Sequence, residues 1–190
     1  MEFRLCTIDK DYIDYLRSDS KLSNVFDNKD DSDFVRKYLG VVFRVGNYYY
    51  YAPLSSPKET DYKIVDGRRV IRNDIIPIIR IAFEEDGCLR LKGTLKLSNM
   101  IPVPADKISY YDIEAEDDEY YKALVTKEYI ILKQKKEKIL KNAKRLYRQK
   151  TCEHEIYTGD VHKPGYLSAT VDFKYAEQMH DKYIQEHSAS

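Results

Sequence analysis

A β-hairpin near the middle of the chain limits the possible folds more than any other feature of the sequence. Residues 38–45 are mostly apolar and rich in β-branched side chains, Gly46-Asn47 is a turn signal, and residues 48–52 resume the strand pattern. Two strands joined by so short a turn pair antiparallel. The hairpin therefore predicts an antiparallel sheet.

Further segments have strand patterns and extend the expected sheet. They are residues 3–8, 62–65, 69–71, 75–83 and 88–97. Asp66-Gly67 indicates a second hairpin, and Pro77 keeps the start of its apolar run out of a central strand. Asp9 is positioned to cap a short helix, and residues 18–33 are polar and predict an exposed loop with room for another short helix.

The last third of the chain has helical patterns. Six of the eight residues 112–119 are acidic, which suits a helix N-terminus. A long pattern covers residues 118–150, and residues 171–185 predict a final helix. One apolar stripe of the long pattern is formed by Leu132, Ile139, Ala143 and Leu146.

Strands followed by helices predict an α+β fold rather than an alternating α/β fold. We expect one domain over residues 1–190, with a β-rich core over about 36–104 and a helical region over about 112–187. No apolar run reaches the roughly 20 residues of a membrane span, and no basic segment leads into an apolar one at the start. The three cysteines are widely spaced, so we expect reduced thiols in a cytoplasmic protein.

The charge is balanced overall but strongly uneven along the chain. Residues 133–150 contain nine basic residues and one acid, Glu137, hence +8, although the whole chain has 32 basic and 32 acidic residues. Four of the cations lie in one row of the predicted helix, namely Lys138, Lys141, Arg145 and Arg148. Such a row suits a polyphosphate backbone. The alternative is a solvated face that balances the preceding acidic segment.

Ser55, Ser56 and Lys58 lie within four residues of one another, just after a predicted strand. Pro57 restrains the backbone between them. Hydroxyl groups, backbone N–H groups and an ammonium group together can bind a phosphate. The alternative is a plain turn in which Ser56 caps a short helix.

Other chemical motifs are weak or absent. Cys152-x-His154 with His162 is poor spacing for zinc, so we expect no metal and no cofactor. The sequence contains no Walker loop, GxGxxG, HExxH or GxSxG pattern.

Three stretches resemble the ToxN/AbiQ family, the endoribonuclease toxins of type III toxin–antitoxin and phage abortive-infection systems. They are Lys37-Tyr-Leu-Gly-Val-Val-Phe43, then Tyr-Tyr-Ala-Pro-Leu-Ser-Ser-Pro-Lys58, and Leu95-Lys-Leu-Ser-Asn-Met-Ile-Pro-Val103. By motif the resemblance covers about residues 36–104, and by helical pattern alone it continues to about 150.

The resemblance implies a compact, strongly twisted antiparallel sheet, an SH3-like toxin barrel, surrounded by helices. It also implies metal-independent RNA cleavage. A small repeated antitoxin RNA, folded as a pseudoknot, would inhibit the toxin within a ring-like hetero-oligomeric toxin–RNA assembly. Ser55, Ser56 and Lys58 would form the catalytic site, and the 2′-hydroxyl of the RNA would attack to leave a 2′,3′-cyclic phosphate.

The RNA-binding groups expected beside that site come from three places in the chain. Arg36, Lys37 and Tyr38 precede the glycine-containing strand, Tyr49 and Tyr51 could stack on unpaired bases, and the row on helix 133–150 would hold the backbone. Two other functions remain open. One is a non-catalytic nucleic-acid-binding module that uses helix 133–150, and the other is a structural domain whose basic helix pairs with an acidic partner.

Overall fold

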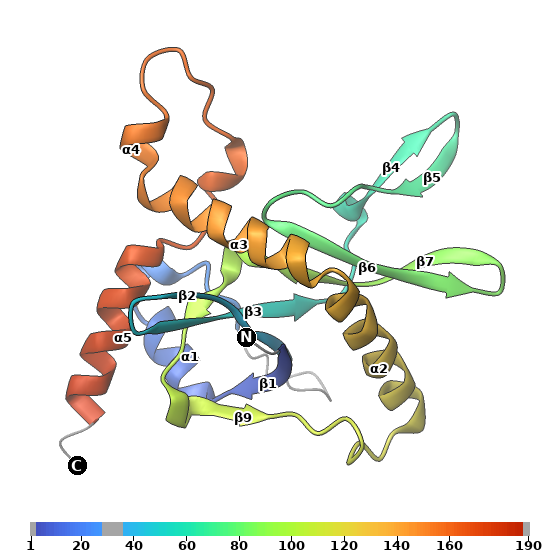
Figure 1. Ribbon diagram of the computed structural model, residues 1–190, viewed down its shortest axis with the longest axis horizontal. Helices are drawn as coiled ribbons and strands as arrows, with labels where there is room; N and C mark the ends of the chain where they lie inside the picture. Colours follow the sequence, from blue (N-terminus) through green and yellow to red (C-terminus); the bar gives the residue numbers. More distant parts are fainter. Residues whose placement is uncertain (1–2, 28–35, 188–190) are drawn as a thin grey trace.

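The computed structural model describes residues 3–27 and 36–187 and has an α+β fold, as predicted (Figure 1). The strands within those residues are β1 (Arg4–Ile8), β2 (Tyr38–Val45), β3 (Tyr48–Ser55), β4 (Tyr62–Val65), β5 (Arg68–Ile71), β6 (Ile78–Glu85), β7 (Cys88–Lys96), β8 (Ile101–Pro102) and β9 (Ile108–Tyr110). The α-helices are α1 (Lys10–Arg17), α2 (Glu119–Gln134), α3 (Lys136–Thr151), α4 (Glu153–Ile156) and α5 (Phe173–His187). Short 3-10 turns include η1 (Ser20–Leu22) and η2 (Glu59–Asp61).

The main sheet is antiparallel and open. Its strand order is β6-β7-β3-β2-β1-β9, with β8 added against β3, and β4 and β5 form a separate hairpin. The two outer strands, β6 and β9, do not pair with each other, so the expected closed barrel is wrong in this detail. Strand β3 pairs with β2 and β8 along its first part and with β7 at its end.

The predicted hairpin is confirmed as β2 and β3, joined by Gly46-Asn47. Gly40 on β2 lies opposite Tyr51 on β3, and a Cβ atom at Gly40 would lie 2.0 Å from the Tyr51 ring. Glycine is therefore required here because the Tyr51 ring packs across the strand. This explains the glycine in the Gly-Val pair of the first motif.

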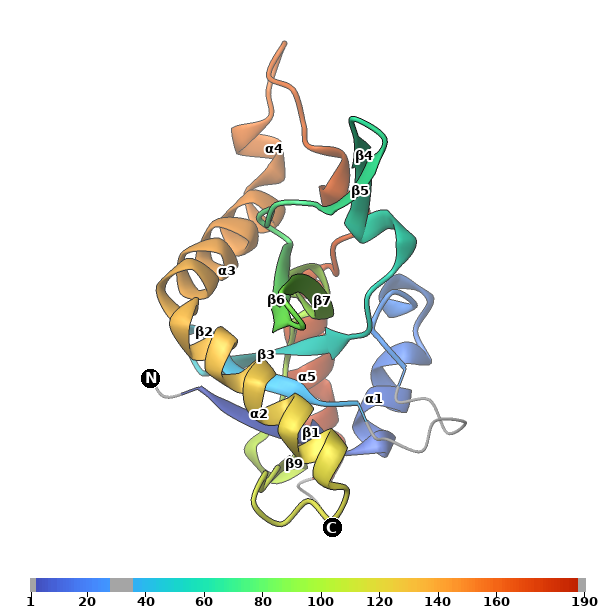
Figure 2. The same ribbon diagram turned by 90° about the vertical axis from the view of Figure 1, so that its right-hand side faces the viewer.

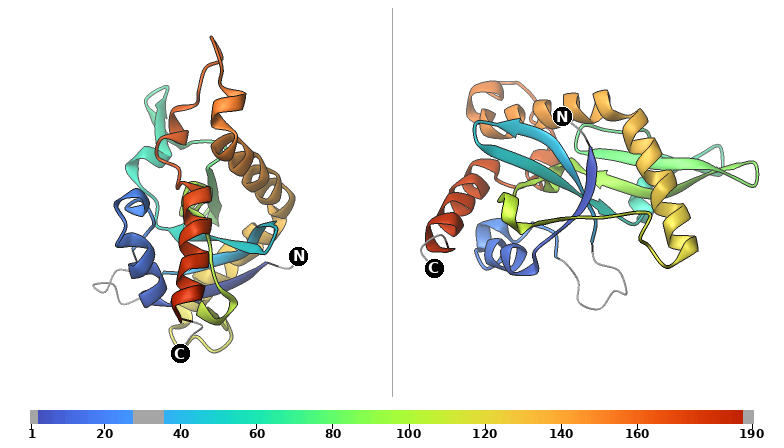
Figure 3. Two further views of the ribbon diagram at one scale, coloured as in Figure 1. Left: turned by 90° about the vertical axis from the view of Figure 1, so that its left-hand side faces the viewer. Right: turned by 60° about the horizontal axis from the view of Figure 1, so that its bottom comes forward.

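Helices cover both sides of the sheet. Figures 2 and 3 show α2 and α3 along one side, with α1 and α5 on the other. All four residues of the predicted apolar stripe are fully buried, although Leu132 belongs to α2 and the other three belong to α3. Every helix in residues 3–27 and 36–187 is too short or too polar to span a bilayer.

The long helical pattern breaks at Lys135, so the expected continuous helix over 118–150 is wrong. Helix α2 ends at Gln134, Lys135 has φ −88° and ψ 8°, and α3 begins at Lys136. The Lys135 ammonium donates to Asp74 at 3.0 Å and to the Arg80 carbonyl at 2.8 Å. These tertiary contacts accompany a break that no proline or glycine marks in the sequence.

Most of the remaining elements agree with the predictions, with one shift, whereas β8, β9 and α4 had no counterpart among the predicted elements. Asp9 caps α1, η1 falls in the expected polar loop, and α5 is the final helix. The part of that loop from residue 28 to 33 lies outside the described residues. The acidic segment mostly precedes its helix, because α2 begins at Glu119 with Asp118 as its N-cap.

Candidate active site at the end of strand β3

The three predicted catalytic residues lie where β3 leaves the sheet. Ser55 is the last residue of β3 and pairs with Thr94 on β7, whose hydroxyl donates to the Ser55 carbonyl at 3.3 Å. Ser56 and Lys58 follow at the exposed surface. The Lys58 ammonium forms no ion pair with any carboxylate in the described part of the chain. The bend therefore presents two hydroxyls and one available cation to solvent.

A buried carboxylate fixes the shape of this bend. Asp61 is 1% exposed, and its carboxylate accepts a hydrogen bond from the Lys58 backbone N–H at 3.0 Å. The Asp61 N–H donates in turn to the Lys58 carbonyl at 2.9 Å. The second carboxylate oxygen accepts from the Arg80 guanidinium at 3.0 Å. Because both side chains of this ion pair are buried, its hydrogen bonds must offset the cost of removing two charges from water.

Arg80 is itself held by the chain around it. Its backbone N–H donates to Asp74 at 2.7 Å, and its guanidinium donates to the Asn73 carbonyl. Asp74 also accepts from Lys135 at 3.0 Å and from Lys138 at 2.7 Å. Burial alone would raise the pKa of Asp74, but hydrogen bonds from Lys138, the Arg80 N–H and Lys135 bring it below its usual value. These contacts connect the α2–α3 junction to the bend through β6.

This arrangement changes the expected row of cations on α3. Lys138 is paired with Asp74, which it shares with Lys135, so its charge is only partly compensated and its ammonium is less available to a phosphate than the other three. Lys141, Arg145 and Arg148 are exposed, and none of them forms an ion pair within residues 3–27 and 36–187. Three of the four predicted cations therefore remain available on this face of α3.

Arg36 and Lys37 lie beside the bend, as the resemblance implied. The Arg36 guanidinium donates to the Leu54 carbonyl at 2.9 Å, and the Leu54 N–H donates to the Lys37 carbonyl at 2.9 Å. The Lys37 ammonium lies 4.2 Å from the centre of the Tyr111 ring. Burial lowers the pKa of Lys37, and the nearby Glu116 carboxylate opposes this change. The Lys37 backbone thus adjoins the end of β3, and its half-buried amine, whose pKa is lowered, lies against Tyr111.

The three tyrosines expected at the RNA surface differ in their exposure. Tyr38 and Tyr51 are 1% and 4% exposed, so their rings are packed in the core and offer no face to a base. Tyr49 is 40% exposed, with the Arg44 guanidinium 4.9 Å from its ring centre. It lies six residues before Ser55 on β3, about 20 Å along the strand. Stacking at the bend therefore needs other aromatic groups.

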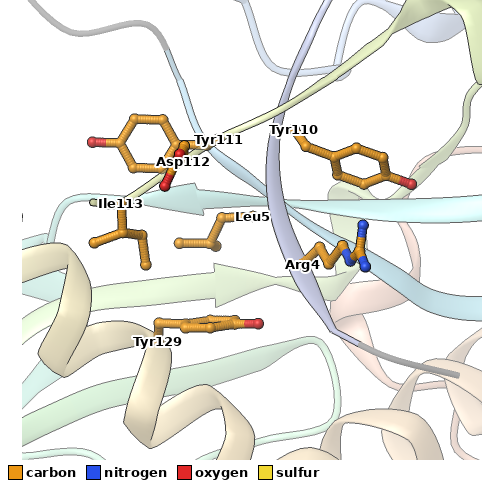
Figure 4. A pocket seen from close by; sticks show the side chains of 7 residues that line it. All are labelled: Arg4, Leu5, Tyr110, Tyr111, Asp112, Ile113 and Tyr129. Carbon is orange, nitrogen blue, oxygen red and sulfur yellow. The ribbon is translucent and has the colours of Figure 1, made fainter. Parts of the chain in front are cut away.

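Sequence reasoning missed a pocket lined by tyrosines between the β1–β9 edge and α2. Figure 4 shows the Arg4 and Tyr110 side chains together on one side of it and Tyr129 of α2 on another. Its volume is about 280 Å³, and Leu5, Tyr111, Asp112 and Ile113 complete the lining. Tyr111 also contacts Lys37, which places the pocket beside the residues that flank the bend. The Tyr110-Tyr111 pair is visible in the sequence, but no periodic pattern distinguishes it from the other tyrosines.

Cys152 and His154 belong to no cluster of three potential metal ligands in the described part of the chain. In residues 3–27 and 36–187, no group of three or more His, Cys, Asp or Glu side chains could hold a metal ion. Cys6, Cys88 and Cys152 are all free, as expected for reduced thiols.

Comparisons with known proteins identify relatives along nearly the whole chain. A family model described as "Toxin ToxN, type III toxin-antitoxin system" matches residues 4–181. The endoribonuclease ToxN of Bacillus thuringiensis subsp. kurstaki is 28% identical over 187 residues, which cover 96% of this chain and 85% of that protein. The endoribonuclease AbiQ of Lactococcus lactis subsp. lactis is 28% identical over 182 residues, with 93% and 87% covered.

Two solved structures extend the comparison to the fold. One, from a study of selective toxin inhibition by a non-coding RNA pseudoknot in type III systems, superimposes with a TM-score of 0.72 at 25% identity, covering 96% of this chain and 98% of the other. The other is the lactococcal anti-phage endoribonuclease AbiQ, with a TM-score of 0.73 at 23% identity, covering 97% and 99%. The second likeness concerns the fold alone.

Proposed function

The chain belongs to the ToxN family of type III toxin–antitoxin toxins, and on this premise we propose that it cleaves RNA at the Ser55–Lys58 bend. It is an endoribonuclease toxin, as its curated relatives are named. The observation that carries the assignment of the site is the bend itself. An exposed Lys58 ammonium, which pairs with no carboxylate among the residues that the structure describes, stands beside two hydroxyl groups on a backbone held by the buried Asp61.

The proposed reaction uses the 2′-hydroxyl of the RNA as the nucleophile. Its oxygen attacks the adjacent phosphorus, the bond from phosphorus to the 5′-oxygen breaks, and the products are a 2′,3′-cyclic phosphate and a 5′-hydroxyl. The protein must accept the proton of the 2′-hydroxyl, stabilise the charge that develops on the phosphoryl oxygens, and protonate the departing 5′-oxygen.

The residues beside the bend can share these tasks. Lys58 stabilises the phosphoryl charge, and the Ser56 hydroxyl orients the 2′-hydroxyl or donates to the phosphate. Serine itself is too weak an acid or base for proton transfer near pH 7. The lowered pKa of Lys37 suits that role better, because a larger share of its amine is neutral at a given pH. Arg36 is engaged with the Leu54 carbonyl and fixes the strand end.

RNA binding extends from the bend over two surfaces. The exposed cations of α3 attract the phosphate backbone, and the tyrosine pocket receives an unpaired base against Tyr110. A structural relative comes from a study of toxin inhibition by an RNA pseudoknot. By analogy, a pseudoknot-forming antitoxin RNA binds this chain in the cytoplasm, within a toxin–RNA assembly.

The experiment that tests this function is incubation of the purified protein with a long RNA transcript in the presence of EDTA. The proposal predicts fragments that accumulate with time and stop accumulating when the cognate antitoxin RNA is added. Binding without any fragment would instead favour the non-catalytic nucleic-acid-binding module.

A further inference from the structure

Strand β7 ends in a lysine whose burial needs an explanation. Lys96 is only 8% exposed. Among the residues that the structure describes, none forms a hydrogen bond or ion pair with the Lys96 ammonium. Lysine is almost never buried to this extent without a partner, because its charge loses hydration.

The strand register places Lys96 on the face of the sheet that carries the candidate active site. Thr94 on β7 lies opposite both Ser55 on β3 and Arg80 on β6. Side chains two residues apart on a strand point to the same face, so Lys96 shares this face with Thr94, Ser55 and Arg80. The charges that act on the Lys96 ammonium are those of Asp61, Lys58 and Arg80, which agrees with this placement.

The tip of the Lys96 side chain reaches solvent although its stem is buried. Within the described residues, the only enclosed side-chain nitrogen or oxygen atoms without a hydrogen-bond partner are Asn24 Oδ1 and Arg80 Nε. The Lys96 nitrogen has no hydrogen-bond partner among those residues either. Because it is not among these enclosed atoms, it must keep some contact with solvent. The Lys96 ammonium is therefore partly open to solvent, and it lies within electrostatic range of Lys58.

The charges around this ammonium do not balance. Three cations, Lys58, Arg80 and Lys96, lie near the single carboxylate of Asp61, which is already paired with Arg80 at 3.0 Å. Burial lowers the pKa of Lys96, Lys58 and Arg80 lower it further, and Asp61 opposes them. Within residues 3–27 and 36–187, two of these positive charges thus lack a countercharge in one partly desolvated place. An anion bound there would relieve the imbalance.

We propose that Lys58 and Lys96 together form the binding site for the scissile phosphodiester, with the Lys96 ammonium on a phosphoryl oxygen. This inference rests on the proposed function and deepens it by naming a second cation of the site. During attack by the 2′-hydroxyl, the phosphoryl oxygens gain negative charge. A cation that is already partly desolvated stabilises that charge more strongly than a fully hydrated one. Lys96 makes no bond and transfers no proton in this step.

The test compares Lys96→Met with the control Lys92→Met, which makes the same change on the same strand. Lys92 pairs with Glu85 at 2.5 Å and lies in the middle of β7, four residues before Lys96. For each variant, the single-turnover cleavage rate of a long transcript and the thermal midpoint are measured. We expect Lys96→Met to lose about 100-fold or more in rate without a fall in its midpoint, because it removes an unpaired buried charge. Lys92→Met should cleave as the wild type does.

A purely structural role of Lys96 gives a different pattern, in which the midpoint falls and the rate follows the folded fraction. That pattern, or a Lys96→Met rate within a few-fold of the wild type, overturns the inference and leaves the proposed function standing. If the wild-type protein and Lys92→Met also fail to cleave, the proposed function itself is wrong.

A measurement on the wild-type protein covers the case in which Lys96→Met does not fold. The lysines are labelled by reductive ¹³C-methylation and observed by NMR. An uncleavable RNA transcript is then added, in which 2′-fluoro groups replace the attacking 2′-hydroxyls. The methyl signal of Lys96 is expected to shift and that of Lys92 to stay. An unmoved Lys96 signal alongside a shifted Lys58 signal contradicts the proposed contact.

Discussion

The carboxylate of Asp61 lies 3.0 Å from the guanidinium of Arg80, and both side chains are buried directly behind the bend that carries Lys58. The two residues are 19 positions apart, on η2 and β6. Their ion pair therefore connects the stability of the sheet to the geometry of the proposed catalytic site.

Removing one partner of this pair should destabilise the fold strongly. Asp61→Ala leaves a buried guanidinium uncompensated, and we expect a loss of about 3–5 kcal/mol in the free energy of unfolding, measured by urea denaturation. Glu59→Ala, which removes the exposed Glu59–Arg69 pair at 2.8 Å, is the matched control and should cost less than about 1 kcal/mol. Equal losses in the two variants would contradict the role given to Asp61.

Replacement of Lys58 should abolish cleavage while the protein still binds RNA. We expect Lys58→Met to lower the single-turnover rate by about 100-fold or more, roughly 3 kcal/mol, because one stabilising charge is lost from the transition state. Lys63→Met changes an exposed lysine of the neighbouring hairpin and should leave the rate unchanged. Antitoxin RNA binding, measured by mobility shift, should persist in both variants. Normal cleavage by Lys58→Met would remove Lys58 from the mechanism.

The exposed arginines of α3 should contribute to RNA affinity through their charge alone. The double variant Arg145→Glu with Arg148→Glu is expected to weaken antitoxin binding and to flatten its dependence on salt, by about one unit of slope for each phosphate that the helix no longer neutralises. Lys138→Gln is the control from the same helix and should have a smaller effect, because that charge is partly offset by Asp74. If affinity and salt slope stay constant in the double variant, the α3 row is a solvated face.

The tyrosine pocket should be sensitive to removal of its exposed ring. Tyr110→Ala is expected to weaken binding of a single-stranded RNA oligonucleotide by about 1–3 kcal/mol, the usual contribution of one stacked base. Tyr120→Ala removes another exposed tyrosine, on α2 and outside the pocket, and should have no effect. Fluorescence anisotropy titrations would measure both, and equal affinities would argue against stacking at Tyr110.

The partly buried carboxyl group of Glu128 on α2 should make stability depend on pH. Burial raises its pKa from 4.5 to about 7, so the neutral form is favoured in the folded state. Below about pH 4.5 the carboxyl group is neutral in both the folded and the unfolded state, so it does not lower the free energy of unfolding. As the pH rises toward 7 the free energy of unfolding falls, and above that pH the charged carboxylate lowers it by about 3 kcal/mol. Glu128→Gln should raise the thermal midpoint at pH 8 and leave it nearly unchanged at pH 4.5. A stabilisation of the same size at both pH values would contradict this account.

Local patterns were sufficient to predict the hairpin and the bend, because each depends on neighbouring residues. The turn at Gly46-Asn47 and the strand ending in Ser55 are recognisable from residue types alone. The break between α2 and α3 could not be recognised in this way, because Lys135 is an ordinary helix former. Its ammonium is bound by Asp74, which is 61 residues away in the sequence.

The support of the site was also beyond the sequence patterns. Asp61 and Arg80 belong to a short turn and a strand with no shared motif, and only the sheet register brings them together. Lys96 lies within the third family motif, but alternation along the strand could not show that a lysine at this position is buried. The sequence also could not show that the Tyr38 and Tyr51 rings are buried rather than available to stack on bases. An aromatic residue on a strand suits the core as well as a stacking surface.

The most direct test of the central claim is analysis of the ends of the RNA fragments produced in EDTA. The account predicts 2′,3′-cyclic phosphate and 5′-hydroxyl ends from the wild-type protein, and no fragments when 2′-deoxy nucleotides replace the ribonucleotides at the cut positions. Fragments that carry 5′-phosphate and 3′-hydroxyl ends, or cleavage of the 2′-deoxy substrate, would contradict attack by the 2′-hydroxyl.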